Sequence, residues 1–275
     1  MRNPLPCLIT GSLIAALSIF SHSLGAQNHP QSVGGNQAPK AVASAGPAPM
    51  HDVSGVWLGP VIPVREPVPA MTPAAQAIFD SNKPNTGPRG VEVALSNDPL
   101  VLCDPLGFPR NVLFETRGFE ISQEPKRVLV LYQYQRVWRE IWTDGRTIPA
   151  DIGGDAANSP DPRWYGYSVG KWADDYTFVI NSTGMDDRSW LDEFGHPHSV
   201  KAQIEERYRR VDANHLELTV NVNDPDDYTK PFEAMKQMFQ LSAKDEMEEQ
   251  FCVPSEAQQY LNVIARPAAA GKGEK

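Results

Sequence analysis

The feature that most constrains the fold is a strict alternation of apolar and polar residues in HLELTVNV, residues 215–222. The apolar positions are Leu216, Leu218, Val220 and Val222. Because successive side chains of a strand point to opposite faces, a period of two residues predicts a strand with one buried face. Such a strand needs neighbouring strands and a second apolar layer to cover it.

Similar segments recur at a spacing of about ten residues, separated by acidic or glycine-containing turns such as Asp144–Gly145. No alternation of strands with long helices accompanies them, so the pattern predicts an antiparallel all-β fold. A sandwich and a barrel both fit, and a barrel removes exposed edges. The predicted strands are residues 52–59, 111–116, 119–123, 127–134, 137–143, 164–173, 176–183, 201–211 and 215–222. Residues 232–241 are left open between strand and helix, and residues 246–253 between a final strand and an extended segment.

Helices are expected only at the periphery of this sheet. TPAAQAIFDSN, residues 72–82, predicts a short helix with Thr72 as its N-cap and Pro73 in its first turn. A second short helix is predicted around residues 255–264. We therefore expect an antiparallel β-barrel of about 8–10 strands with short peripheral helices. A barrel of this size has room for one small ligand.

The N-terminal residues indicate export. Arg2 precedes LITGSLIAALSIF, residues 8–20, an apolar segment too short to span a bilayer as a helix. Small residues then favour cleavage after Ala26, so residues 1–26 are predicted to be a signal peptide. An uncleaved anchor is the alternative, whereas Cys7 precedes the apolar segment and is badly placed for a lipid anchor. We expect a periplasmic or secreted protein without stable membrane insertion after cleavage.

Composition divides the remainder of the chain. Residues 27–51 and 267–275 are rich in Pro, Gly and Ala and poor in large apolar side chains, which predicts a disordered linker and a disordered tail. Residues 52–266 are predicted to form a single β-barrel domain.

The charge balance excludes some partners. The formal net charge is -9 and becomes -10 if residues 1–26, which contain Arg2 and no acid, are removed. This acidity argues against binding to nucleic acid or to an anionic membrane surface. The chain has no glycine-rich phosphate loop and no nucleophile elbow, so we predict no cofactor.

Two cysteines remain after the predicted cleavage, Cys103 and Cys252. In an oxidising compartment such a pair predicts a disulfide, with two free buried thiols as the alternative. A bridge that closes a loop of about 150 residues contributes about 5 kcal/mol in the chain-entropy description.

Several motifs resemble known proteins. SGVW, residues 54–57, is similar to the Gly-x-Trp that opens lipocalin-like (calycin) barrels, in which the Trp closes one end. A longer set, in the same order over residues 52–253, resembles a widespread, largely uncharacterised family of secreted bacterial proteins. This resemblance implies a calycin-like barrel and export, and implies no reaction. The motifs are CDPLGFPR (103–110), REIWTDGRTIP (139–149), YGYSVGKWADDYTFVINSTG (165–184), WLDEFGHPHS (190–199), IEERYRRVD (204–212) and VNDPDDYTKPF (222–232).

His196 and His198 allow three interpretations. They form an acid/base pair with a carboxylate, they bind a metal, or they belong to a polar turn at the barrel mouth. Because the segment connects two strands, a metal is the least favoured and no metal site is predicted. The carboxylates expected for proton transfer are Asp144 and Glu206, and a metal would need Asp192, Glu193 or Glu206 as a third ligand.

Other polar and aromatic residues also have two interpretations. Asp144 and Arg146 either form an ion pair in a turn or meet the polar head of a ligand. Glu206 shares a strand face with Ile204, so it is either an interior proton donor or neutralised by Arg139 or Arg207. Six aromatic residues either line a cavity or pack in the core: Trp142, Trp164, Tyr165, Tyr167, Trp172 and Trp190. The predicted ligand-binding residues are Arg146, Trp142, Tyr167, Trp190, Tyr208 and Glu140.

Three classes of function follow from these residues. The first is an exported barrel that binds a small apolar or aromatic molecule with a polar head. The second is a lyase, hydratase or isomerase that uses a His–carboxylate pair. The third is an envelope protein with a filled barrel and an interacting outer face.

Overall fold

The computed structural model describes residues 46–60, 67–113, 118–244 and 246–271. The chain divides into two compact units, residues 1–43 and 44–275, and all described residues belong to the second. The predicted signal peptide, residues 1–26, lies outside the described residues, as does most of the predicted linker.

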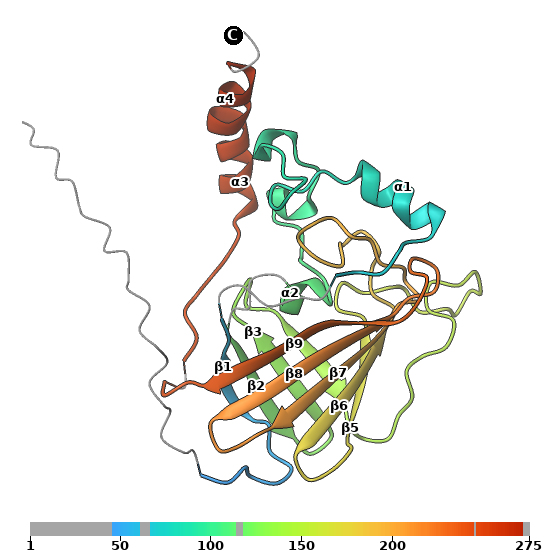
Figure 1. Cartoon of the computed structure of the whole chain (residues 1–275), viewed down its shortest axis with the longest axis vertical. Helices are drawn as coiled ribbons and strands as arrows, with labels where there is room; N and C mark the ends of the chain where they lie inside the picture. The colour runs from blue at the N-terminus through green and yellow to red at the C-terminus, as the bar shows by residue number, and fades with distance from the viewer. Residues whose placement is uncertain (1–45, 61–66, 114–117, 245, 272–275) are drawn as a thin grey trace, which may run out of the picture. The chain divides into compact units, whose positions relative to one another are not determined.

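The described residues contain nine strands that follow one another around a closed barrel, in chain order (Figure 1). The predicted β-barrel is therefore confirmed. Strand β1 closes it by pairing with both β2 and β9. The strands are β1 Gly55–Leu58, β2 Phe119–Glu124, β3 Arg127–Tyr132, β4 Trp138–Trp142, β5 Tyr167–Trp172, β6 Thr177–Thr183, β7 Gln203–Arg210, β8 His215–Asn223 and β9 Phe232–Leu241.

One strand pair corrects the expectation of a purely antiparallel sheet. Strands β4 and β5 run parallel and share two register pairs, Ile141 with Ser168 and Trp142 with Val169. A parallel pair needs a crossover connection, and residues 143–166 return the chain to the starting end (yellow-green in Figure 1). The Asp144–Gly145 turn therefore begins this crossover and does not form a hairpin.

The alternation of apolar and polar residues predicted over residues 215–222 is confirmed in β8. Leu216, Leu218, Val220 and Val222 are all buried, and they face a core that includes Trp57. The Trp57 indole donates a hydrogen bond to the Val53 carbonyl at 2.9 Å. The guanidinium of Arg210, at the end of β7, lies 4.6 Å from the centre of the Trp57 ring.

The N-terminal helix is also confirmed. Helix α1 covers Pro73–Ser81, and the Thr72 hydroxyl accepts a hydrogen bond from the Ala75 amide at 3.3 Å. The predicted strand over 111–116 is wrong, because helix α2 covers Arg110–Leu113. The Pro109 carbonyl accepts hydrogen bonds from the amides of Val112 and Leu113, which closes a helical turn and buries both side chains. Residues 114–117 lie outside the described residues.

The remaining helices lie together around the C-terminus. They are η1 Val93–Leu95, η2 Pro99–Leu102, α3 Pro254–Tyr260, η3 Leu261–Ala265 and α4 Arg266–Ala270. Helix α4 extends the structure into the predicted disordered tail. Residues 246–253, which were predicted to be a strand or an extended segment, form no strand and make a single bridge, from Gln250 to Tyr134.

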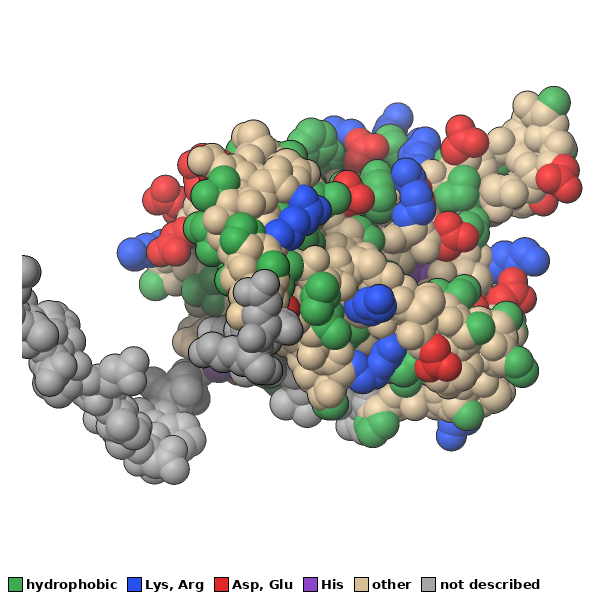
Figure 2. Space-filling model, turned by 90° about the horizontal axis from the view of Figure 1, so that it is seen from above, with side chains coloured by type: hydrophobic (Ala, Val, Ile, Leu, Met, Phe, Trp, Pro, Cys, Tyr) green, Lys and Arg blue, Asp and Glu red, His purple; other side chains and the backbone are tan. Residues whose placement is uncertain are grey.

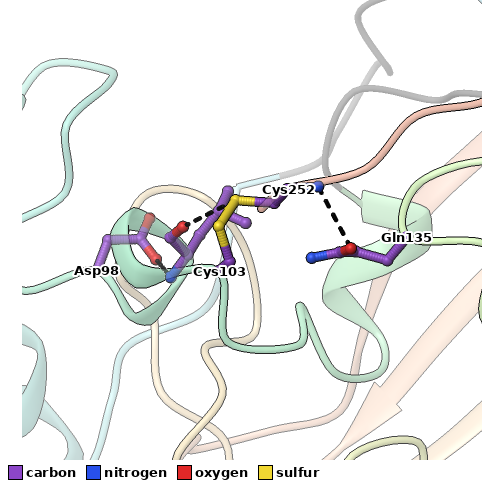
Figure 3. The surroundings of a disulfide bond; sticks show 5 residues. Asp98, Cys103, Gln135 and Cys252 are labelled. Atoms are coloured by element: carbon purple, nitrogen blue, oxygen red, sulfur yellow. Dashed lines mark hydrogen bonds between the residues drawn. A yellow bond between two sulfur atoms is a disulfide. The ribbon is translucent and has the colours of Figure 1, made fainter. Parts of the chain in front are cut away.

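A disulfide between Cys103 and Cys252 joins η2 to the segment before α3, as predicted (Figure 3). The Cys252 amide also donates a hydrogen bond to the Gln135 side chain at 3.3 Å. These links attach the segment before α3 to η2, which precedes β2, and to the turn between β3 and β4. Among the described helices, none has the length and apolar character that crossing a membrane requires.

Candidate functional site

A charged pair occupies the interior of the barrel. Arg139 on β4 and Glu206 on β7 are 2% and 0% exposed. The Arg139 guanidinium donates to both Glu206 carboxylate oxygens, with Nη2–Oε2 at 2.8 Å and Nη1–Oε1 at 3.2 Å. This bidentate geometry supplies the charge-assisted hydrogen bonds that a buried ion pair needs. The prediction that an arginine neutralises Glu206 is confirmed, and that arginine is Arg139.

Hydroxyl groups complete this network. The Arg139 guanidinium also donates to Ser168 Oγ at 3.1 Å, Ser182 Oγ at 2.9 Å and Tyr132 Oη at 3.0 Å. The Tyr208 hydroxyl donates to Glu206 Oε1 at 2.8 Å. Burial raises the pKa of Tyr132 to about 12 and raises the pKa of Tyr208 well above its usual value, so both phenols stay protonated.

The network joins buried side chains of five consecutive strands, from β3 to β7. The Phe108 ring covers one side of it, with the Arg139 guanidinium carbon 3.6 Å from the ring centre. Both carboxylate oxygens of Glu206 already accept hydrogen bonds from protein groups. Glu206 and Tyr208 therefore serve as structural groups and are not presented to a ligand.

The Arg139–Glu206 pair explains which side chains of β4 point inward. Arg139 and Ile141 point inward and are buried, whereas Trp138 and Glu140 are exposed on the outer face. Glu140 accepts a hydrogen bond from Arg127 at 2.5 Å. A charged residue is inward-facing on this strand because Glu206 supplies its counter-charge.

A pocket of about 610 Å³ lies where β4 and β5 meet. Its walls come from β4, from residues 146–149 and 163–166 of the crossover, and from the start of β5. We name this site the seam pocket. Its volume is in the usual range for small-molecule sites. Its lining includes five aromatic residues and three arginines: Trp138, Trp142, Trp164, Tyr165 and Tyr167, and Arg139, Arg146 and Arg163.

Arginines stack on the aromatic rings of the seam pocket. The Arg146 guanidinium carbon lies 3.5 Å from the centre of the Trp142 ring, and that of Arg163 lies 4.1 Å from the Tyr167 ring centre. Each contact is a cation–π interaction that restrains both partners. The Tyr167 hydroxyl donates to the Asp161 carbonyl at 2.9 Å, which fixes its ring further.

Charges around the seam pocket are only partly compensated. Arg146 donates to Asp144 with an Nη2–Oδ2 distance of 2.6 Å, and this hydrogen bond holds the pKa of Asp144 below its usual value. Arg139 is balanced by Glu206 in the interior. Across the described ranges, no carboxylate lies within ion-pair distance of Arg163.

The His196 side chain interacts with a carboxylate of its own loop. Its Nδ1 lies 2.7 Å from Asp192 Oδ2, and its ring stacks on Phe79 at 4.6 Å between centres. Asp192 also accepts a hydrogen bond from the Phe194 amide at 2.9 Å, and the His196 carbonyl accepts one from the Leu191 amide. His196 and Asp192 lie at the wall of a smaller, mostly apolar pocket of about 210 Å³.

His198 is buried and bonded elsewhere. Its Nε2 lies 2.9 Å from Ser189 Oγ, and burial lowers the pKa of the imidazole. Thus neither histidine forms the predicted pair with Asp144 or Glu206, because each group has a different partner. Where the structure describes the chain, no cluster of three or more His, Cys, Asp or Glu side chains is arranged to hold a metal ion.

The seam pocket contains part of the predicted ligand-binding set. Arg146, Trp142, Tyr167 and Glu140 line it. The predicted Trp190 is instead buried, with the Arg110 guanidinium 5.3 Å from its ring centre. Two aromatic candidates, Trp164 and Tyr165, also line the pocket, whereas Trp172 packs against Phe178.

Sequence reasoning missed Arg163. This residue begins RWYGY, in which it precedes three aromatic residues, and that adjacency was the available signal. Comparison with protein-family models, curated proteins and solved structures finds no match to this chain. The resemblance to the secreted bacterial family therefore stays a prediction.

Proposed function

We propose that this protein binds a small molecule with a planar, apolar body in the seam pocket. The observation that carries the proposal is the set of five aromatic residues around a pocket of about 610 Å³: Trp138, Trp142, Trp164, Tyr165 and Tyr167. Aromatic side chains combined with placed polar groups are typical of sites for small ligands. Stacking against such rings also favours flat ligands over branched aliphatic ones.

The site differs from the one expected in a hollow barrel. The buried Arg139–Glu206 pair lies on the inner faces of β4 and β7, whereas the seam pocket lies between β4, β5 and the crossover. Arg139 and Ser168 line the seam pocket and also belong to the network, so the network supports the pocket wall. A pocket floor that is already held by hydrogen bonds lowers the ordering cost of binding.

We further propose that the protein acts in the periplasm or outside the cell. The Cys103–Cys252 disulfide supports this, because structural disulfides persist in oxidising compartments. The predicted signal peptide, residues 1–26, points the same way. Thiol alkylation of the protein in freshly lysed producing cells tests the proposal. We expect both cysteines to be protected from alkylation, and the proposal fails if both react.

Native mass spectrometry of the purified protein tests ligand binding. The expected result is a retained or added small molecule that is lost when Trp164→Ala removes part of the aromatic wall. Tyr176→Ala is the matched control, because Tyr176 is an exposed aromatic residue between β5 and β6 and does not line the pocket. Equal binding by both variants would place the ligand elsewhere and reject the seam pocket.

A further inference from the structure

We propose that the seam pocket selects an anionic ligand, and that Arg163 is the residue that holds its carboxylate or an equivalent acidic group. This inference rests on the proposed function, because it assigns the ligand class of the same pocket.

The pocket has an excess of positive charge in an acidic protein. Its lining contains three arginines, Arg139, Arg146 and Arg163, and one acid, Glu140. The first two arginines are paired with Glu206 and Asp144, and Glu140 is paired with Arg127. The charge of Arg163 is left without a counter-charge among the described residues, although the whole chain has a net charge of -9.

The side chains of the other described arginines all have a hydrogen-bonding or ion-pair partner, which is a carboxylate in some and a carbonyl or amide oxygen in others. Arg188, which lies over the Trp164 ring, donates to Asp186 at 2.6 Å. On the face drawn in Figure 2, acidic and basic side chains are interspersed over the whole surface. Among the described arginines, Arg163 is the one whose side chain has neither a hydrogen bond nor an ion pair, and it lines the seam pocket.

The backbone of Arg163 is held firmly. Its amide donates to the Gly184 carbonyl at 3.0 Å, and its carbonyl accepts hydrogen bonds from the amides of Gly166 and Asp186, each at 2.9 Å. Arg163 also forms an isolated parallel bridge with Met185. The starting point of the side chain is thus fixed by the loop that follows β6.

The side chain is oriented by its stacking partner. The guanidinium carbon lies 4.1 Å from the centre of the Tyr167 ring, so one face of the guanidinium is covered. A stacked guanidinium keeps its N–H edge free, and that edge matches the two oxygens of a carboxylate. Arg146 shows the arrangement within this same pocket, because it stacks on Trp142 and binds Asp144 through its edge.

The ligand implied by these observations is an aromatic or polycyclic acid. Its apolar rings contact the aromatic wall, and its acid group takes the position at Arg163 that Asp144 takes at Arg146. A neutral molecule of the same shape keeps the first contact and loses the second. The proposal therefore predicts a preference for the acid over its amide.

The test uses three pairs of matched probes: benzoate and benzamide, indole-3-acetate and indole-3-acetamide, and 2-naphthoate and 2-naphthamide. Each is titrated into the full exported chain by calorimetry at pH 7. We expect the acid of at least one pair to bind about ten-fold or more tightly than its amide. Added salt should weaken binding of the acid and leave binding of the amide unchanged.

Two variants identify the residue responsible. Arg163→Gln should reduce acid binding to the level of the amide without changing amide binding. Arg209→Gln is the matched control, because Arg209 is an exposed arginine on β7 that lies outside the pocket. It should retain the preference of the wild type.

The outcomes separate the two proposals. Equal binding of acid and amide, or an unchanged preference in Arg163→Gln, overturns the anion assignment and leaves ligand binding in the pocket standing. Absence of binding by all six probes overturns the assignment, whereas the search for a retained molecule by native mass spectrometry decides ligand binding independently.

Discussion

Removal of Arg139 tests the buried network, which forms both the barrel interior and part of the pocket wall. In Arg139→Leu, Glu206 would remain at 0% exposure without the Arg139 guanidinium, which donates five hydrogen bonds in the network. Removing one member of a buried ion pair typically costs about 3–5 kcal/mol, because the other charge stays desolvated. We expect the free energy of unfolding to fall by about that amount.

The pH dependence of this loss identifies its cause. An unpaired buried carboxyl has a raised pKa in the folded state, so the folded protein binds more protons than the unfolded one. Its stability therefore falls as pH rises, and the deficit of Arg139→Leu should be larger at pH 8 than at pH 5. Urea unfolding followed by tryptophan fluorescence at both pH values measures the difference.

The double variant Arg139→Leu with Glu206→Leu is the control for this prediction. Because neither buried charge remains, it should recover most of the lost stability, since apolar replacement of a whole buried pair is often neutral. A loss below about 1 kcal/mol in the single variant, or a loss that does not depend on pH, would refute the assignment of Arg139 as the counter-charge of Glu206.

Further predictions concern three other features. Reduction of the Cys103–Cys252 disulfide should lower the unfolding free energy by about 3–5 kcal/mol, measured by urea unfolding with and without reductant; an equal midpoint would contradict it. Because the pKa of Tyr132 is about 12 in the fold and about 10 when exposed, stability should decline between pH 10 and pH 12. Absorbance titration checks this prediction, and a single tyrosine transition near pH 10 in the folded protein would oppose it. Gly170→Ala should cost about 1–3 kcal/mol, because the added methyl would lie 2.5 Å from Phe178 and 2.7 Å from Ile141, and an unchanged melting temperature would count against this packing.

The sequence predicted the features whose cause is local. Alternation along residues 215–222 depends only on strand geometry, and the cap at Thr72 depends only on its neighbours. The disulfide followed from the number of cysteines and the expected compartment. Each of these signals lies in a few neighbouring residues or in the number of cysteines.

Features that depend on distant partners were predicted less well. Whether Arg139 or Glu140 faces inward depends on Glu206, which is 67 residues from Arg139 along the chain. The parallel pairing of β4 and β5 depends on how the crossover packs, and its Asp144–Gly145 turn looks locally like a hairpin turn. The short helix at Arg110–Leu113 occupies a strand-like sequence because tertiary packing buries Val112 and Leu113.

The candidate site shows the same division. Aromatic residues in the strands were recognised as pocket candidates, and four of the six line the seam pocket. The histidines were grouped with Asp144 and Glu206 because residue type suggested proton transfer. Their actual partners, Asp192 and Ser189, are local groups within the same loop.

The most direct test of the account is a crystal structure of the protein with 2-naphthoate. The account predicts that the ring system lies against the aromatic side chains of the seam pocket and that the carboxylate is within hydrogen-bonding distance of Arg163. A ligand bound at another surface, or an empty seam pocket at saturating 2-naphthoate, would contradict it.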